Sequence, residues 1–149
     1  MKGDRVKVES GGGAGLDQIL SAGGREGADV DGMATRADRE MAVMVWNYHD
    51  SEMAYPPAAV QLAISGIAKN KGAVLVQHYR IDDDHSNAYT VWKAMGSPQH
   101  PTTDQYAELK SKDGLQLLNS PTWTEVVNGQ VKIGTEMPRQ SISLLLLKW

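Results

Sequence analysis

The densest group of side chains that could do chemistry is a run of three aspartates and a histidine, Asp82–His85. Carboxylate oxygens can hold a hard cation such as Ca²⁺. The spacing of an EF-hand loop is absent, however, and neighbouring residues of an extended chain point to opposite sides. We therefore expect a solvated corner where a strand leaves a sheet, with no metal and no cofactor.

The residues that follow this run are varied in chemistry. Hydrogen-bonding groups, a cation and two aromatic rings are supplied by His85, Ser86, Asn87, Tyr89, Trp92 and Lys93. A sandwich does not need such an insertion to close its core, and loops of this kind on a rigid scaffold are disproportionately functional. The alternative is a structural plug, in which Tyr89, Trp92 and Met95 form one helical stripe that packs onto a sheet.

No catalytic motif is recognisable elsewhere. The four histidines form no H-E-x-x-H pair, and His78, inside a predicted strand, is expected to be a hydrogen-bonded packing residue. There is no cysteine and no G-x-S-x-G elbow, and the glycine-rich stretch at 11–13 lacks the Lys-Ser/Thr of a phosphate loop. Candidates for a glycosidase carboxylate pair, by residue type alone, are Asp50, Glu52, Glu108, Glu125 and Glu136. We therefore assign no catalytic residue.

The composition is that of one soluble globular domain. The 149 residues are 41% hydrophobic and 22% charged, with a formal net charge of -3. No basic field invites nucleic acid. The longest purely aliphatic run, Leu144–Leu147, is far too short for a membrane span, and no signal peptide is visible after Met1. The sequence therefore gives no indication of the compartment.

Alternating and continuous apolar runs predict a mostly-β fold. Expected strands cover Arg5–Glu9, Met41–Tyr48, Val60–Ile64, Ala73–Ile81, Thr124–Val127, Gln130–Thr135 and Ile142–Leu146. Met41–Tyr48 is apolar on both faces, as in a strand between two layers, and Trp46 is expected in the core. Asn128-Gly129 predicts a two-residue hairpin between its flanking strands.

Helical signals interrupt this pattern. Thr102 and Gln105 fit a capping box, and Tyr89, Trp92 and Met95 have helical spacing. We expect a β-sandwich with a short helical insertion at about residues 85–112. Residues 1–32 would be a loose lead-in, with one short helix at Leu16–Leu20, and residues 33–149 would form the sandwich, so that 1–149 is a single domain.

Several longer motifs carry a family resemblance. V-W-N-Y-H-D at 45–50, H-Y-R-I-D at 78–82 and H-S-N-A-Y-T-V-W-K-A-M-G-S-P at 85–98 resemble bacterial β-xylosidases of glycoside hydrolase family 39. The similarity continues through L-Q-L-L at 115–118 and P-R-Q at 138–140. It covers nearly the whole chain, and chance agreement over the fourteen-residue motif is implausible.

The resemblance implies a parent enzyme with a (β/α)₈ barrel that carries two catalytic glutamates and works by retention. Such a barrel needs about 250 residues and would precede Met1. No glutamate here matches the catalytic pair, so the chain alone is expected to be inactive. It looks like the β-sandwich that follows the barrel.

The functional expectation is thus a non-catalytic accessory domain of a β-xylosidase-like glycosidase that degrades xylo-oligosaccharides. It would pack on the barrel and stabilise it, with residues 85–93 facing the barrel or its active-site rim. The expected partners are the barrel of the same polypeptide and a xylo-oligosaccharide, with neither nucleic acid nor membrane. A free-standing carbohydrate-binding module is the alternative, and a small self-sufficient hydrolase is the least favoured reading.

Overall fold

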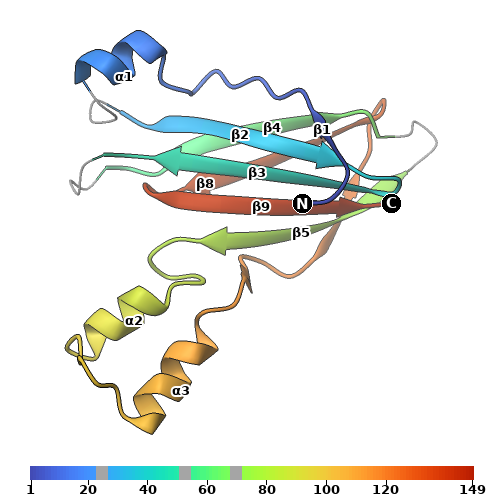
Figure 1. Ribbon diagram of the computed structural model, residues 1–149. Coiled ribbons are helices and arrows are strands. Elements are labelled where there is room, and N and C mark those ends of the chain that lie inside the picture. The colour runs from blue at the N-terminus through green and yellow to red at the C-terminus, as the bar shows by residue number, and fades with distance from the viewer. Residues whose placement is uncertain (23–26, 51–54, 68–71) are drawn as a thin grey trace.

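The computed structural model describes residues 1–22, 27–50, 55–67 and 72–149. Two antiparallel sheets form a sandwich (Figure 1). The larger sheet has the order β1-β2-β3-β9-β5-β6, with β7 also paired to β5, and the smaller sheet contains β4 and β8. The strands of the larger sheet are β1 Asp4–Val6, β2 Asp29–Arg36, β3 Glu40–Tyr48, β5 Ala73–Ile81, β6 Gln116–Leu117, β7 Thr122–Glu125 and β9 Ser141–Lys148. Those of the smaller sheet are β4 Ala58–Ser65 and β8 Gln130–Met137. The predicted β-sandwich is confirmed.

The core lies between the two sheets. Alternate side chains of β3, β5 and β9 face β4 and β8, because successive side chains of a strand point to opposite faces. The buried apolar set includes Val43, Val45, Val74, Val76, Val131, Met137, Leu145 and Leu147. The other side chains of these strands therefore point away from the smaller sheet.

The turn at Asn128-Gly129 forms as predicted, but the strands beside it separate. Both residues have positive φ, as a type I′ turn requires, and Val127 forms an isolated bridge with Gln130. Strand β7 then pairs with β5, whereas β8 pairs with β4 in the other sheet. The prediction of a continuous hairpin is therefore wrong, because each strand finds its long partner elsewhere.

Trp46 also differs from its expected place. Met41, Val43 and Val45 are buried on the inner face of β3, which puts Trp46 on the opposite face, where it is only half-buried. The expectation of a core tryptophan is wrong. The apolar run is real, but within the described residues a second layer covers only one side of it.

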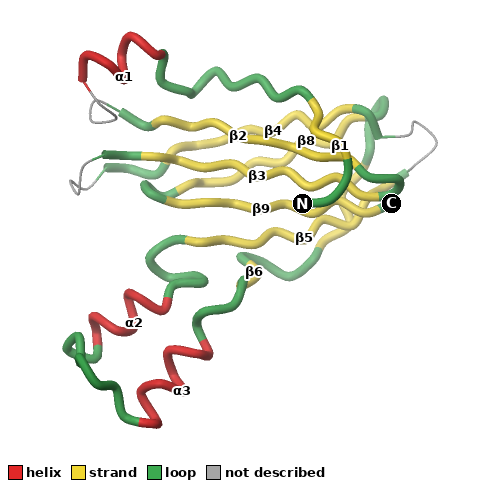
Figure 2. The backbone as a smooth tube through the Cα atoms, in the orientation of Figure 1, coloured by secondary structure: helices red, strands yellow, loops and turns green. Residues whose placement is uncertain are grey.

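Three helices complete the part of the chain that the structure describes. They are α1 Leu16–Ala22, α2 Ala88–Ala94 and α3 Thr103–Ser111. The capping box of Thr102 and Gln105 is present, and α2 contains Tyr89 and Trp92 of the predicted helical stripe, with Met95 as its C-cap. Helices α2 and α3 form a hairpin that projects from the end of β5 (Figure 2). Strand β1 and the first residues of β2 lie within residues 1–32, so part of the expected lead-in belongs to the larger sheet.

Candidate functional site

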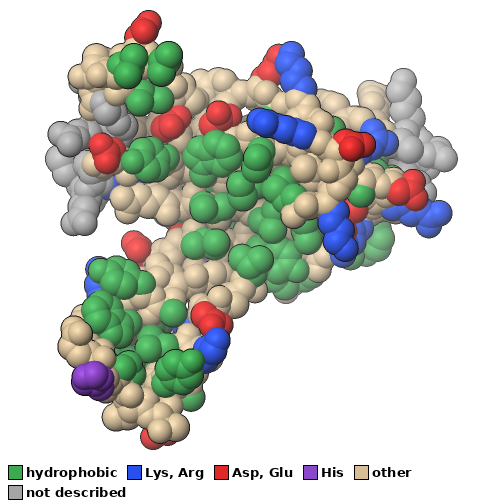
Figure 3. Space-filling model, in the orientation of Figure 1, with side chains coloured by type: hydrophobic (Ala, Val, Ile, Leu, Met, Phe, Trp, Pro, Cys, Tyr) green, Lys and Arg blue, Asp and Glu red, His purple; other side chains and the backbone are tan. Residues whose placement is uncertain are grey.

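The first candidate surface is the outer face of the larger sheet, the side turned away from β4 and β8. Its apolar side chains are Met33, Ala42, Met44, Trp46, Leu75, Tyr79, Ile81, Ile142, Leu144 and Leu146, which we call the outer sheet face. Figure 3 shows hydrophobic side chains gathered over β2, β3, β9 and β5 in this view. All but one of them are half-exposed or exposed; Ala42 is buried. They therefore form a continuous apolar surface rather than scattered residues.

The strand register aligns these side chains in rows. One row runs Met33, Met44, Leu144, Tyr79 and Leu117 across five strands. The next row runs Trp46, Ile142 and Ile81. Side chains directly opposite each other on one face are in contact range. The rows are thus the cross-strand packing expected of a face that is covered by another layer.

Strand β9 shows most clearly that the outer sheet face is suited to burial. Its inner side chains include the fully buried Ser141 and Ser143, whereas its outer ones are Ile142, Leu144 and Leu146. Burial favours apolar over polar side chains. If the outer face of β9 were solvated, polar side chains would be expected on that face and apolar ones on the inner face. The sequence of β9 is therefore suited to cover on both faces.

The size of the outer sheet face fits an interface between domains. Four strands of about eight residues, spaced about 4.8 Å apart with a rise of about 3.3 Å per residue, give a footprint of about 500 Å². The largest apolar patch of a typical monomer is about 300–600 Å² and is often functional. Charged side chains lie towards the margin, where Lys148 and Glu40 form an ion pair of 3.7 Å.

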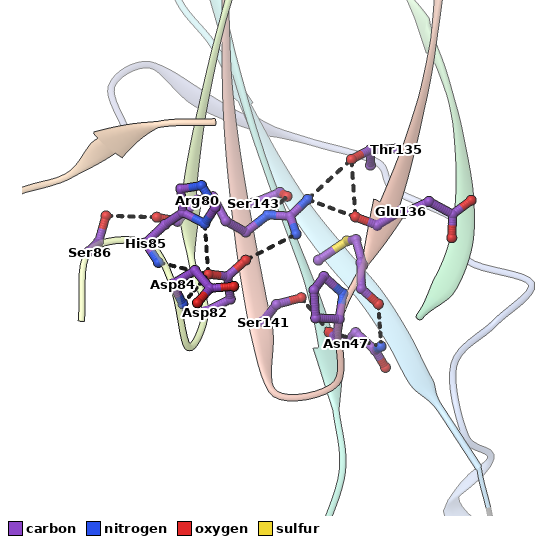
Figure 4. Close-up of polar contacts among 12 residues, drawn as sticks. Asn47, Arg80, Asp82, Asp84, His85, Ser86, Thr135, Glu136, Ser141 and Ser143 are labelled. Carbon is purple, nitrogen blue, oxygen red and sulfur yellow. Dashed lines mark hydrogen bonds and ion pairs between the residues drawn. The ribbon is translucent and has the colours of Figure 1, made fainter. Parts of the chain in front are cut away.

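Behind this face, a buried arginine joins both sheets (Figure 4). Arg80 of β5 is 2% exposed. Its Nε donates to Ser143 Oγ of β9 at 3.1 Å, and its Nη2 donates to Thr135 Oγ1 and to the Glu136 carbonyl of β8 at 3.1 and 2.9 Å. Its Nη1 lies 3.5 Å from Asp82 Oδ2. These contacts fix the end of β5 relative to the smaller sheet.

Asp82 organises the start of the helical insertion. Its Oδ1 accepts hydrogen bonds from the backbone N–H groups of Asp84 and His85 and lies 2.8 Å from His85 Nδ1. Burial opposes ionisation of this carboxyl, but the hydrogen bonds from His85 and from the two backbone groups hold its pKa below the ordinary value. The Asp82 carboxylate therefore stays charged beside Arg80.

His78 is a packing residue, as predicted. Its Nε2 lies 2.9 Å from Ser143 Oγ, the same hydroxyl that accepts from Arg80. Burial, and then the positive charge of Arg80, lower the pKa of His78 to about 4. The imidazole is neutral at pH 7 and shares a hydrogen bond with the Ser143 hydroxyl.

Three of the six insertion residues that the sequence singled out bind Arg80 or Asp82. His85 contacts Asp82, Ser86 Oγ donates to the Arg80 carbonyl at 2.7 Å, and Asn87 Nδ2 donates to the Asp82 carbonyl at 3.0 Å. Asn87 Oδ1 also caps α2, accepting from the N–H groups of Tyr89 and Thr90. These residues position the hairpin at the end of β5.

The other three residues form an aromatic group on α2. The rings of Tyr89 and Trp92 stack at 5.6 Å between centroids, and Lys93 Nζ lies 5.0 Å from the Tyr89 ring centroid. Trp92 Nε1 donates to the Pro98 carbonyl at 3.0 Å. Tyr89 is 60% exposed, and neither α2 nor α3 contains a buried residue. The hairpin is therefore poorly covered by its own domain.

The remaining candidates do not assemble into a catalytic or metal site. Glu108, Glu125 and Glu136 are exposed and lie on α3, β7 and β8, and Glu52 lies outside the described residues. Among the residues described here, no group of three or more His, Asp or Glu side chains could hold a metal ion. No helix in the described ranges is long and apolar enough to cross a membrane.

The sequence patterns did not single out the buried polar residues of the sandwich, which include Arg80, Asn47 and the two serines of β9. Arg80 follows Val74, Val76 and His78 on the inner side of the strand alternation, so its direction was visible in the sequence. Asn47 Nδ2 donates to the carbonyls of Met137 and Pro138. That contact joins residues ninety positions apart and leaves no local signal.

Comparison with known proteins then decides the family. The model of the family "Glycosyl hydrolases family 39" matches residues 26–120, well over half of the 149 residues. The chain belongs to glycoside hydrolase family 39. No curated protein matches it.

Solved structures show the same fold in family 39 enzymes. The family 39 enzyme from Xanthomonas axonopodis pv. citri has a TM-score of 0.67 and 16% identity, over 78% of this chain and 25% of that chain. A bacterial orthologue of human α-L-iduronidase has a TM-score of 0.67 and 21% identity, over 81% and 22%. A monomeric β-xylosidase from Caulobacter crescentus CB15 has a TM-score of 0.62 and 17% identity, over 78% and 26%. The chain thus spans about a quarter of the length of these enzymes, and it is similar to part of a glycosidase.

Proposed function

We propose that this family 39 chain is a non-catalytic accessory domain of a β-xylosidase-like glycosidase. It packs against a catalytic (β/α)₈ barrel of the same polypeptide and stabilises that barrel. The observation that carries this proposal is the outer sheet face, which is apolar across four central strands and has no second layer among the described residues. A barrel presents helices on its outside, and a helix layer is the usual cover for such a sheet.

The helical hairpin extends the proposed contact. Hydrophobic side chains of α2 and α3 appear on the same side of the molecule as the outer sheet face (Figure 3). Tyr89, Trp92 and Lys93 would then lie against the barrel or its active-site rim, held by His85, Ser86 and Asn87. They would act by positioning, since a displacement of about 1 Å near a reacting group can cost roughly a hundredfold in rate.

The test is to produce the barrel and this chain as separate proteins and assay an aryl β-xyloside. The chain alone should show no turnover, and adding it should raise the activity or the thermal stability of the barrel. Turnover by the chain alone that survives repurification and disappears when one of its carboxylates is replaced would overturn the proposal.

A carbohydrate-binding module is the second candidate, favoured by exposed aromatic rings. Trp123 of β7 is 70% exposed and Tyr89 is 60% exposed, and such rings suit the faces of sugars. Titration calorimetry with xylo-oligosaccharides separates the two functions. If the isolated chain binds a xylo-oligosaccharide and loses this binding in Trp123→Ala or Tyr89→Ala, the module is favoured. If the chain gives no heat of binding with the sugars and binds only the barrel, the accessory domain is favoured.

A further inference from the structure

Helix α1 carries an apolar face that nothing in the described part of the chain covers. Leu16, Ile19 and Leu20 lie three and four positions apart, so they share one side of the helix. They are 71%, 42% and 75% exposed, and none of the seven described residues of α1 is buried. Isolated helices shorter than about 12–15 residues are marginal in water. A helix this short with an uncovered apolar face is therefore suited to packing against a partner.

The base of α1 is fixed to the larger sheet. The Gly12 carbonyl accepts from the backbone N–H of Val30 at 2.9 Å, and the Ala14 N–H donates to Asp29 Oδ1 at 2.8 Å. Ser10 Oγ donates to the Val30 carbonyl. These hydrogen bonds join the residues just before α1 to the first two residues of β2. The helix is therefore presented at a defined edge of the sheet.

Helix α1 and the helical hairpin leave the larger sheet at the same end but at opposite sides. The start of β2 and the end of β5 are aligned, because one row runs from Asp31 through Trp46 and Ile142 to Ile81. Figure 1 shows α1 beside β2 and the hairpin beyond β5, with β3 and β9 between them. Three strand spacings of about 4.8 Å separate β2 from β5, which is about 15 Å. A helix with its side chains is about 10–12 Å wide, so the sheet has room for one between these elements.

The apolar side chains of α1 lie on the same side of the molecule as the outer sheet face. Figure 3 shows hydrophobic side chains on α1, over the larger sheet and on the hairpin in a single view. A layer of helices that covers the outer sheet face would therefore meet α1 at one side and the hairpin at the other.

The small size of the α1 face favours a tethered partner over a second copy. Its three apolar side chains supply well under the about 800 Å² per partner that a stable complex between separate proteins buries. A contact within one polypeptide needs less area, because the docked domain holds the two surfaces at a high effective concentration. The chain spans about a quarter of the length of the similar enzymes, so a longer polypeptide has the length to supply such a domain.

We propose that the apolar face of α1 is a second docking surface for the catalytic barrel. This rests on the proposed function, which places the barrel on the outer sheet face. A helix from the outer layer of the barrel lies over the sheet between α1 and the hairpin, and Leu16, Ile19 and Leu20 pack against it. Apolar burial on the sheet is non-directional, so the contact with α1 fixes the sideways position of the barrel.

The experiment compares the 149-residue chain with the complete polypeptide that contains it, by hydrogen–deuterium exchange of residues 16–22. We expect exchange in α1 to be at least about tenfold slower in the complete polypeptide, since covering its apolar face stabilises the helix. Leu20→Lys should remove most of this difference. The matched control is Gln18→Lys, because Gln18 is exposed on the opposite side of α1 and gains the same charge. Lysine is as good a helix former as leucine or glutamine, so the control should keep the difference within about twofold.

Methionine oxidation in the same samples reports on Met33 and Met44 of the outer sheet face. If these methionines are protected in the complete polypeptide but α1 exchanges as in the isolated chain, the barrel docks without α1 and only the inference about α1 is overturned. If α1 is protected and the methionines are not, docking through the outer sheet face is wrong, and with it the placement of a barrel helix between α1 and the hairpin.

Two further outcomes would overturn the role of the α1 face. Protection that Leu20→Lys retains in full would show that this face is not the surface that is covered. Protection of α1 in the isolated chain that rises with protein concentration would assign the face to a second copy.

Discussion

Arg80 and Asp82 form a buried ion pair on which several elements depend. Arg80 bonds to β8 and β9, and Asp82 receives the first hydrogen bonds of the helical insertion. Removing one member of a buried pair leaves the other charged and uncompensated. Replacing either residue should therefore lower the stability of both the sandwich and the helical hairpin.

Asp82→Asn tests this pair. Loss of the carboxylate charge beside the buried Arg80 should lower the free energy of unfolding by about 3 kcal/mol or more, as measured by urea denaturation. The matched control is Asp83→Asn, because Asp83 is exposed and a surface change should stay within about 0.5 kcal/mol. Equal effects of the two substitutions would show that the Arg80–Asp82 pair does not stabilise the fold.

The neutral His78 predicts a dependence of stability on pH. Its pKa is about 4 in the folded chain against 6.5 for a free histidine, so the unfolded chain binds the extra proton first as the pH falls. The contribution of His78 to the free energy of unfolding should be fully present above pH 6.5. It should decline between pH 6.5 and 4 and be fully lost below pH 4. His49, whose pKa burial and Arg139 also lower, contributes in the same direction.

Nuclear magnetic resonance titration of the imidazole of His78 should give a midpoint near 4. Urea midpoints at pH 7 and pH 5 should differ less in His78→Gln than in the unmodified chain. A midpoint near 6.5 would mean that His78 is solvated and that the Ser143 contact does not form.

At the scale of elements, the insertion depends on Asn87. This side chain caps α2 and also donates to the Asp82 carbonyl. Loss of a helix cap typically costs about 1 kcal/mol. Asn87→Ala should therefore speed amide exchange in residues 88–94, while exchange in the central strands stays unchanged. Asn87→Asp keeps the capping oxygen and should retain most of the protection; equal effects of both variants would assign the stability to the lost Nδ2 donor instead.

How far the sequence predicts these elements depends on whether the interactions that form them are local or distant in the sequence. Helix α1, the capping box at Thr102 and the strand at Ala73–Ile81 are encoded locally and were predictable. The partner of β7 was not, because the turn at Asn128-Gly129 specifies the bend but not which strands follow it. Trp46 was misplaced for a different reason: a run that is apolar on both faces indicates two covering layers, and the described residues supply one.

At the scale of the whole molecule, the outer sheet face should make the isolated chain associate. A face of about 500 Å² with half-exposed Met44, Leu144 and Trp46 loses free energy when it leaves water. We expect sedimentation to show oligomers or aggregates at high protein concentration. The double variant Met44→Lys and Leu144→Lys should shift the chain towards monomer. A well-behaved monomer without these substitutions would argue against a missing partner.

Titration calorimetry between the two separate proteins tests most directly whether the outer sheet face binds the catalytic barrel. We expect a one-to-one complex with a negative heat-capacity change, which marks burial of apolar surface. Met44→Lys and Leu144→Lys together should abolish binding, whereas Val127→Lys, an exposed substitution away from that face, should leave the dissociation constant within about twofold. If the double variant retains full binding, or if the unmodified chain does not bind, the outer sheet face is not the surface that binds the barrel.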